Sequence, residues 1–191
     1  MKKITFIFIL LTLAFNSYSQ RITFQDILNG VSNALNTMGS HPQDLFYQSF
    51  IVNSSSNAKM FGGHDKMDVQ VILPANTINW YYRVTVVEKN SNFEWPINER
   101  LISCIQNGTN PRSFATVRIP INVYLLNNAG DNYNFSTGKR FTYQGPYSVL
   151  NTDSFFGQCN LTGDIWLGIQ NVSPMVGSKV ILEIVAIVKG Q

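Results

Sequence analysis

The chain has 191 residues, of which 45% are hydrophobic and only 13% charged, and its formal charge is +3. A chain of this length forms one domain with a sizeable core. Its basic residues form no stripe or cluster, which argues against nucleic acid and against an anionic membrane surface as partners. The many Asn and Ser residues must therefore supply much of the wetted surface.

The first segment is typical of a cleavable secretory signal peptide. Lys2 and Lys3 precede an apolar run over residues 4–15, and the small residues Ser17 and Ser19 follow it. The apolar run is shorter than the roughly 20 residues that a membrane-spanning helix needs, and no second run of that length follows. We therefore expect residues up to position 19 to be removed on export; an uncleaved membrane anchor is the alternative.

Removal of the signal leaves residues 20–191 as a single domain with a formal charge of +1, because two lysines leave with it. The domain is expected to be secreted, periplasmic or on the cell surface, without a membrane span. Its two cysteines, Cys104 and Cys159, are predicted to form a disulfide in that oxidising compartment, with two separate thiols as the alternative. Neither His41 nor His64 lies at a ligand spacing from a cysteine, so no metal site and no cofactor is predicted.

A helix is expected over about residues 23–38. Thr23 and Asp26 resemble a capping box, apolar residues then repeat at helical spacing, and Gly39 ends the pattern. We expect this helix to pack on its own domain, while an amphipathic helix that binds a partner is the alternative.

From about Asp44 the hydrophobic period changes to two, which predicts strands. The runs 67–73 and 80–86 alternate on either side of a turn at Pro74 to Thr77, and we expect them to be antiparallel neighbours. Further strands are expected over 117–125, 165–169 and 179–189.

Two of these strands carry further information. Pro120 indicates an edge position or a bulge in the run 117–125, because proline cannot donate to a sheet. The last strand is apolar on both faces apart from Glu183, which predicts a central strand that is covered on both sides. Between the strands, Pro96 and the apolar residues that follow it at helical spacing predict a short helix up to Gln106.

Strands with polar turns and no strand–helix alternation predict a mainly β fold. We expect an antiparallel β-sandwich or jelly roll with an N-terminal helix and one short inserted helix.

The segments LPANTINWYY at 73–82 and WLGIQN at 166–171, followed by the run 180–188, resemble a group of uncharacterised secreted bacterial proteins. The closing pattern is also similar to the last strands of GOLD-type and pre-peptidase-type β-sandwich modules. The resemblance implies a fold and an accessory or interaction role, and it assigns no functional residue.

Catalytic chemistry has little support in the sequence, and no catalytic residue is predicted. His64, Asp65 and Asp68 form the only local cluster of titratable groups, which we interpret as a solvated loop, with a metal or acid/base site as the alternative. The segment 127–134 offers oxygen ligands for calcium but lacks the acidic spacing of a calcium loop, so we expect a β-turn there.

Binding is better supported, because several aromatic residues fall on faces that the alternation assigns to solvent or to loops. The predicted binding residues are Tyr81, Arg83, Tyr124 and Trp166, and Tyr133, Tyr143 and Tyr147 belong to the same exposed class. Rings beside polar groups suit sugars, although packing in the core or at an edge is the alternative for each residue.

These patterns lead to the hypothesis of a secreted, non-enzymatic module that binds a glycan or cell-envelope polysaccharide, or else a secreted or envelope protein. Two alternatives stay open. One is a hydrolase of unfamiliar type that uses His64 and Asp65, and the other is a structural subunit that assembles through strand edges.

Overall fold

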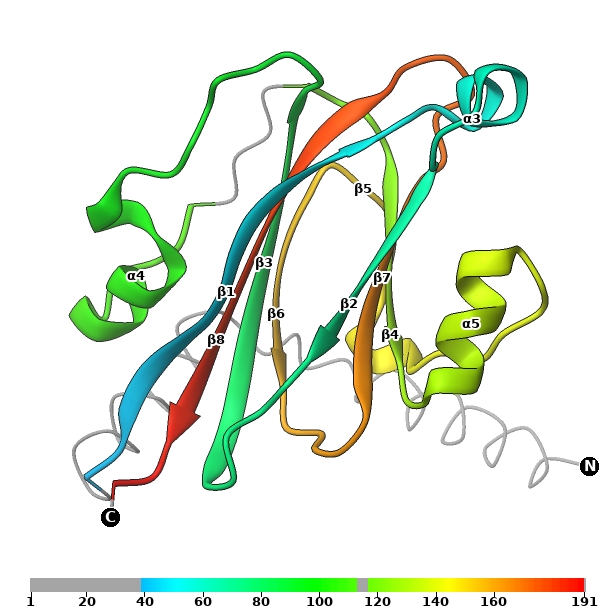
Figure 1. The fold of residues 1–191 in the computed structure, drawn as a ribbon. Coiled ribbons are helices and arrows are strands. Elements are labelled where there is room, and N and C mark those ends of the chain that lie inside the picture. Colours follow the sequence, from blue (N-terminus) through cyan, green and yellow to red (C-terminus); the bar gives the residue numbers. More distant parts are fainter. Residues whose placement is uncertain (1–38, 113–116, 191) are drawn as a thin grey trace, which may run out of the picture.

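The computed structural model describes residues 39–112 and 117–190, so the predicted signal peptide and the predicted helix over 23–38 lie outside the described residues. Two four-stranded sheets make up the fold, and all neighbouring strands are antiparallel (Figure 1). The predicted antiparallel β-sandwich is thereby confirmed.

Sheet A has the strand order β1-β8-β3-β6 and sheet B the order β2-β7-β4-β5. The strands of sheet A are β1 (His41–Val52), β8 (Ser178–Val188), β3 (Thr77–Glu88) and β6 (Ser154–Cys159). Those of sheet B are β2 (Lys66–Val71), β7 (Ile165–Asn171), β4 (Ile121–Leu126) and β5 (Val149–Thr152).

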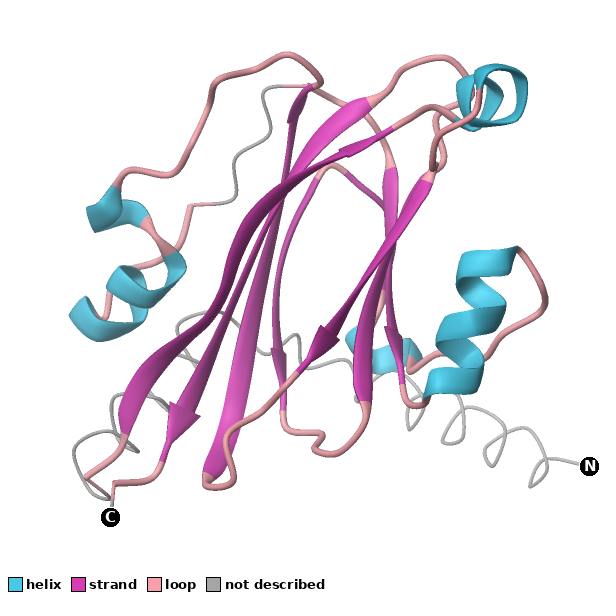
Figure 2. Ribbon diagram, in the orientation of Figure 1, coloured by secondary structure: helices cyan, strands magenta, loops and turns pink. Residues whose placement is uncertain are grey.

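The helices are α3 (Ser55–Phe61), α4 (Leu101–Asn107) and α5 (Ala129–Thr137), with single 3-10 turns at Ile97–Glu99 and Gly145–Tyr147. Two of the helices, α4 and α5, lie on opposite sides of the sandwich, and α3 lies at its upper end (Figure 2). Helix α4 contacts β1 and β8 of sheet A, whereas α5 contacts β2, β7 and β4 of sheet B. The turn at 97–99 together with α4 confirms the short helix that the sequence predicts after Pro96.

The main core lies between the sheets and is built from the inward residues of both. It contains Trp80, Tyr82, Val84 and Val86 of β3, and Leu182 and Ile184 of β8, against Ile121, Val123, Leu167 and Ile169 of sheet B. Strand β8 is buried on both faces between β1 and β3, as its apolar sequence predicts. The indole N–H of Trp80 donates to the carbonyl of Leu161, just after β6, at 3.0 Å.

The expectation that the runs 67–73 and 80–86 are neighbours is wrong. The turn forms, since Thr77 N–H donates to the carbonyl of Pro74 at 3.1 Å, but it carries the chain from β2 in sheet B to β3 in sheet A. The physical reason is that the two strands differ in length and in burial. Strand β3 is 12 residues long and buried on both faces, and it pairs along nearly its whole length with β8, whereas the 6-residue β2 keeps one polar face in solvent.

Two local expectations concern β4 and the segment after it. Pro120 precedes β4, which lies between β7 and β5, so the expected edge position is wrong. The pairing of β4 with β5 does shift register between Ile121 and Val123, just after the proline, which agrees with the alternative of a bulge. The segment 127–134 forms the start of α5 and no β-turn. Asn128 caps that helix, because its side-chain oxygen accepts from the backbone N–H of Asp131 at 2.8 Å.

Candidate functional site

The four predicted binding residues do not form one surface. Tyr81 and Arg83 lie on the outer face of sheet A, and Tyr124 and Trp166 lie on the outer face of sheet B. Tyr81, Arg83 and Tyr124 are at most 8% exposed, and Trp166 is half-buried. The alternation correctly placed these residues on the outer faces of their strands. Other parts of the chain cover both outer faces, so the prediction that these side chains are exposed to a ligand is wrong.

Arg83 belongs to a buried polar network beneath α4. Its guanidinium forms an ion pair with Glu183, its direct cross-strand neighbour on β8, and donates to the carbonyl of Glu99 at 2.8 Å. Glu183 in turn accepts the backbone N–H of Leu101, the first residue of α4, at 2.9 Å. The guanidinium also stacks on the ring of Trp95, with 3.8 Å to the ring centroid. This arrangement fixes α4 to the sheet and leaves Arg83 inaccessible to a ligand.

Tyr124 lies in an aromatic cluster between sheet B and α5. Its ring meets those of Phe135 and Phe141 edge-on, with centroids 5.6 and 5.1 Å away. Burial raises the pKa of the Tyr124 hydroxyl. Of the aromatic residues predicted on this side, Tyr133 and Tyr143 are exposed, as expected.

The two cysteines are free and buried, so the predicted disulfide is wrong. Cys104 lies on α4 outside sheet A, whereas Cys159 of β6 faces the core between the sheets. The sheet therefore separates the two sulfur atoms. Burial raises the pKa of the Cys159 thiol to about 11, which keeps it protonated and unreactive at neutral pH.

The titratable cluster at 64–68 lines a hollow of about 640 Å³ between β1, α3, β2 and α5. Asp68 accepts hydrogen bonds from Asn132 at 2.8 Å and from Ser136 at 3.0 Å. Within residues 39–112 and 117–190, no hydrogen bond or ion pair joins the side chain of His64 to Asp65 or Asp68, and no group of three His, Cys, Asp or Glu residues could hold a metal. The arrangement shows no nucleophile–base pair.

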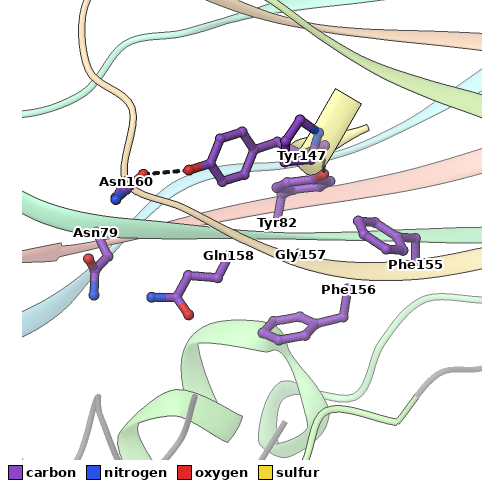
Figure 3. Close-up of a pocket in the computed structure, with 9 residues that line it drawn as sticks. Asn79, Tyr82, Tyr147, Phe155, Phe156, Gly157, Gln158 and Asn160 are labelled. Atoms are coloured by element: carbon purple, nitrogen blue, oxygen red, sulfur yellow. Dashed lines mark hydrogen bonds between the residues drawn. The ribbon is translucent and has the colours of Figure 1, made fainter. Parts of the chain in front are cut away.

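A better-formed site lies beside β6, where a pocket of about 550 Å³ opens between this strand and the 3-10 turn at Gly145–Tyr147 (Figure 3). Four aromatic side chains and three amides line it, and none of the described lining residues is charged. The aromatic residues are Tyr82, Tyr147, Phe155 and Phe156, and the amides are Asn79, Gln158 and Asn160.

Hydrogen bonds hold the wall of this pocket in place. The hydroxyl of Tyr82 donates to the carbonyl of Tyr147, and the hydroxyl of Tyr147 donates to the side-chain oxygen of Asn160 at 2.8 Å (Figure 3). Gly157 lets the rings of Tyr82 and Phe155 pack directly against the backbone of β6, because a Cβ there would lie 2.7 Å from the Tyr82 ring and 2.8 Å from the Phe155 ring. The Tyr147 ring is therefore fixed before any ligand arrives, with the amide of Asn160 next to it.

Sequence reasoning found only Tyr147 of this set. The run Ser154–Cys159 reads SFFGQC, in which two adjacent aromatic residues and a glycine break the alternation that marks a half-buried strand. Adjacent aromatic residues followed by Gly157 were the available signal for a strand with a ring on each face and with rings packed against its glycine.

The fold and the pocket together define an antiparallel β-sandwich with a preformed, uncharged aromatic–amide site. No known family model matches the chain, and no similar protein was found among curated proteins. No helix in the part of the chain that the structure describes is long and apolar enough to cross a membrane.

Proposed function

We propose that this protein is an exported, non-enzymatic binding module that takes a neutral glycan into the pocket beside β6. The observation that carries the proposal is the composition of the pocket, which combines aromatic rings and amides with no charged side chain among its described residues. An accessory binding role is also what the resemblance to GOLD-type and pre-peptidase-type modules implies.

Both kinds of lining group suit a neutral sugar. An aromatic face packs against the apolar C–H face of a pyranose, while an amide offers two donors and an acceptor to ring hydroxyls. A volume of about 550 Å³ is ordinary for a small-ligand site, so the pocket would hold one end or a short stretch of an oligosaccharide. The pinned Tyr147 favours affinity, because little side-chain freedom is lost on binding.

Affinity electrophoresis through gels that contain soluble β-glucan, mannan or galactan tests this proposal. We expect at least one polymer to retard the protein, and the retardation to fall about tenfold or more in Tyr147→Ala and in Gln158→Ala. The matched controls are Tyr133→Ala and Gln70→Ala, which remove an exposed tyrosine and an exposed glutamine outside the pocket. The glycan assignment is wrong if no polymer retards the protein, or if the control variants lose as much retardation as the pocket variants.

Salt dependence separates a neutral ligand from a charged one. Binding through rings and amides is expected to be nearly unchanged between about 0.05 and 0.5 M salt, because ionic screening acts on charge pairs. A steep loss of retardation with salt would instead indicate ion-pair contacts outside this pocket. Export is checked separately by mass spectrometry, which should find the mature N-terminus at Gln20.

A further inference from the structure

One end of the sandwich presents apolar side chains outward from two neighbouring elements. Met60 and Phe61 at the end of α3 are 73% and 80% exposed, and Met175 in the loop between β7 and β8 is 81% exposed. Val176 beside it is also exposed. Figure 1 shows α3 and this loop together at the upper end of the molecule, and Ser55 N–H donates to the carbonyl of Ser173 at 3.1 Å. The two apolar pairs therefore belong to one end of the fold.

The loop is held rigidly in this exposed position. Asn171 is fully buried, and its amide group donates to the carbonyls of Val52 at 3.3 Å and Val176 at 2.9 Å. Its side-chain oxygen accepts the backbone N–H of Ser173 at 2.9 Å, and the Ser173 hydroxyl accepts that of Val176 at 3.1 Å. The buried polar residues thus fix a loop whose apolar side chains point into solvent.

Three cationic side chains lie near these apolar side chains. Lys59 is the neighbour of Met60 on α3, and Lys89 and Arg118 line a hollow of about 480 Å³ that reaches Val176. Lys89 donates to the side-chain oxygen of Asn53 at 3.0 Å, which leaves its charge unneutralised. Within the described ranges none of these three cations forms an ion pair, and Glu88 is the one carboxylate that lines the hollow.

We propose that this end of the sandwich docks on the surface of an anionic lipid bilayer. Phe61 and Met175 would enter the boundary between headgroups and acyl chains, and the three cations would lie against lipid phosphates. The apolar side chains protrude singly from a short helix and a loop. A bilayer accepts such tips at any spacing, whereas a protein partner would need a matching pocket for each. This proposal departs from the expectation drawn from the sequence, where no basic cluster is visible because Lys59, Lys89 and Arg118 lie far apart along the chain.

Cosedimentation with large unilamellar vesicles tests the proposal independently of the glycan pocket. Vesicles of phosphatidylcholine alone are compared with vesicles that also contain about 30% phosphatidylglycerol. The protein is produced by export, and all variants share one N-terminus, so the residues that remain before position 39 contribute equally to every measurement. We expect clear binding to the anionic vesicles and at least tenfold weaker partitioning to the neutral ones.

The variants separate the apolar from the charged part. Phe61→Ser with Met175→Ser, and separately Lys59→Gln with Lys89→Gln and Arg118→Gln, should each weaken partitioning at least tenfold without a change in Tm. The matched control is Ile97→Ser, which removes an 83% exposed apolar side chain from the 3-10 turn beside α4 and should bind like wild type.

Three results would overturn the assignment. One is failure of the wild-type protein to cosediment with either vesicle, and another is an equal loss in Ile97→Ser. The third is a concentration-dependent dimer in size-exclusion chromatography that Phe61→Ser abolishes, which would identify this end as an interface between two copies of the chain.

Discussion

Replacement of Glu183 by leucine should destabilise the protein more than any other single change at a charged residue of sheet A. Arg83 and Glu183 are both nearly fully buried, and the carboxylate also accepts the backbone N–H of Leu101. Glu183→Leu leaves the guanidinium in the interior without its counter-charge, and removal of one partner of a buried ion pair costs about 3–5 kcal/mol. That is a large part of the about 5–15 kcal/mol by which a domain is stable.

Urea denaturation followed by tryptophan fluorescence measures the effect. With a slope of about 2 kcal/mol per molar, the expected loss lowers the unfolding midpoint by about 2 M. The control is Glu99→Leu, which removes a partly exposed carboxylate just before α4. The ion pair of this carboxylate with Arg112 has an N–O distance of 3.9 Å. It should change stability by less than about 1 kcal/mol.

The double variant Arg83→Met with Glu183→Leu distinguishes charge burial from loss of packing. Because a buried pair that is replaced as a unit by apolar side chains is often neutral, we expect the second change to recover at least half of the loss. The reasoning is refuted if Glu183→Leu costs less than about 1 kcal/mol, or if the double variant is less stable than the single one.

Three further predictions concern the main core, the loop between β7 and β8, and the aromatic cluster between sheet B and α5. Because burial raises the pKa of Cys159 to about 11 in the folded state from 9.0, its contribution to stability is complete below about pH 9 and is lost as the pH rises to about 11. Urea titrations should show a loss of up to about 3 kcal/mol over this range, and the part due to the thiol should vanish in Cys159→Ala. Asn171→Ala should cost about 2–3 kcal/mol in the same assay, because it removes the buried amide that bonds the carbonyls of Val52 and Val176 and the N–H of Ser173; a cost below about 0.5 kcal/mol would contradict that. Gly168→Ala places a Cβ 2.9 Å from the Phe135 ring and should lower stability by about 1–3 kcal/mol, whereas Gly145→Ala meets nothing within 4 Å and should not; equal Tm values for both variants would contradict the overpacking argument.

The longer strands could be predicted because each carries its own signal. Strands β3 and β7 show the period of two in a short window, and β8 is a continuous apolar run that indicates a strand buried on both faces. Helix α5 carries no such signal, since its sequence AGDNYNFST consists largely of weak helix formers. It exists because Asn128 caps its first turn and because Phe135 is buried against Gly168. The cap is local and could have been recognised from Asn128 and Asp131, whereas the burial of Phe135 depends on tertiary structure that a local pattern does not report.

The candidate site was harder to predict than the fold, for a physical reason. Alternation along a strand separates two faces, but it does not say whether solvent or another part of the chain covers the second face. Tyr81 and Tyr124 lie on faces that α4 and α5 cover, so their rings became core residues. The pocket beside β6 instead takes rings from both faces of one strand and from a turn, and that juxtaposition has no period in the sequence.

Arg83 shows which sequence signal would have corrected the assignment. A glutamate within an apolar central strand must find a cation, because a buried unpaired carboxylate is too costly. Arg83 is the basic residue in the other long, doubly buried strand, and the antiparallel register of β3 and β8 places it directly opposite Glu183 across 100 positions of sequence. The isolated charge at Glu183 therefore predicts a buried cationic partner on a neighbouring strand. Because Arg83 fills that role, the sequence alone argues against Arg83 as a ligand-binding residue.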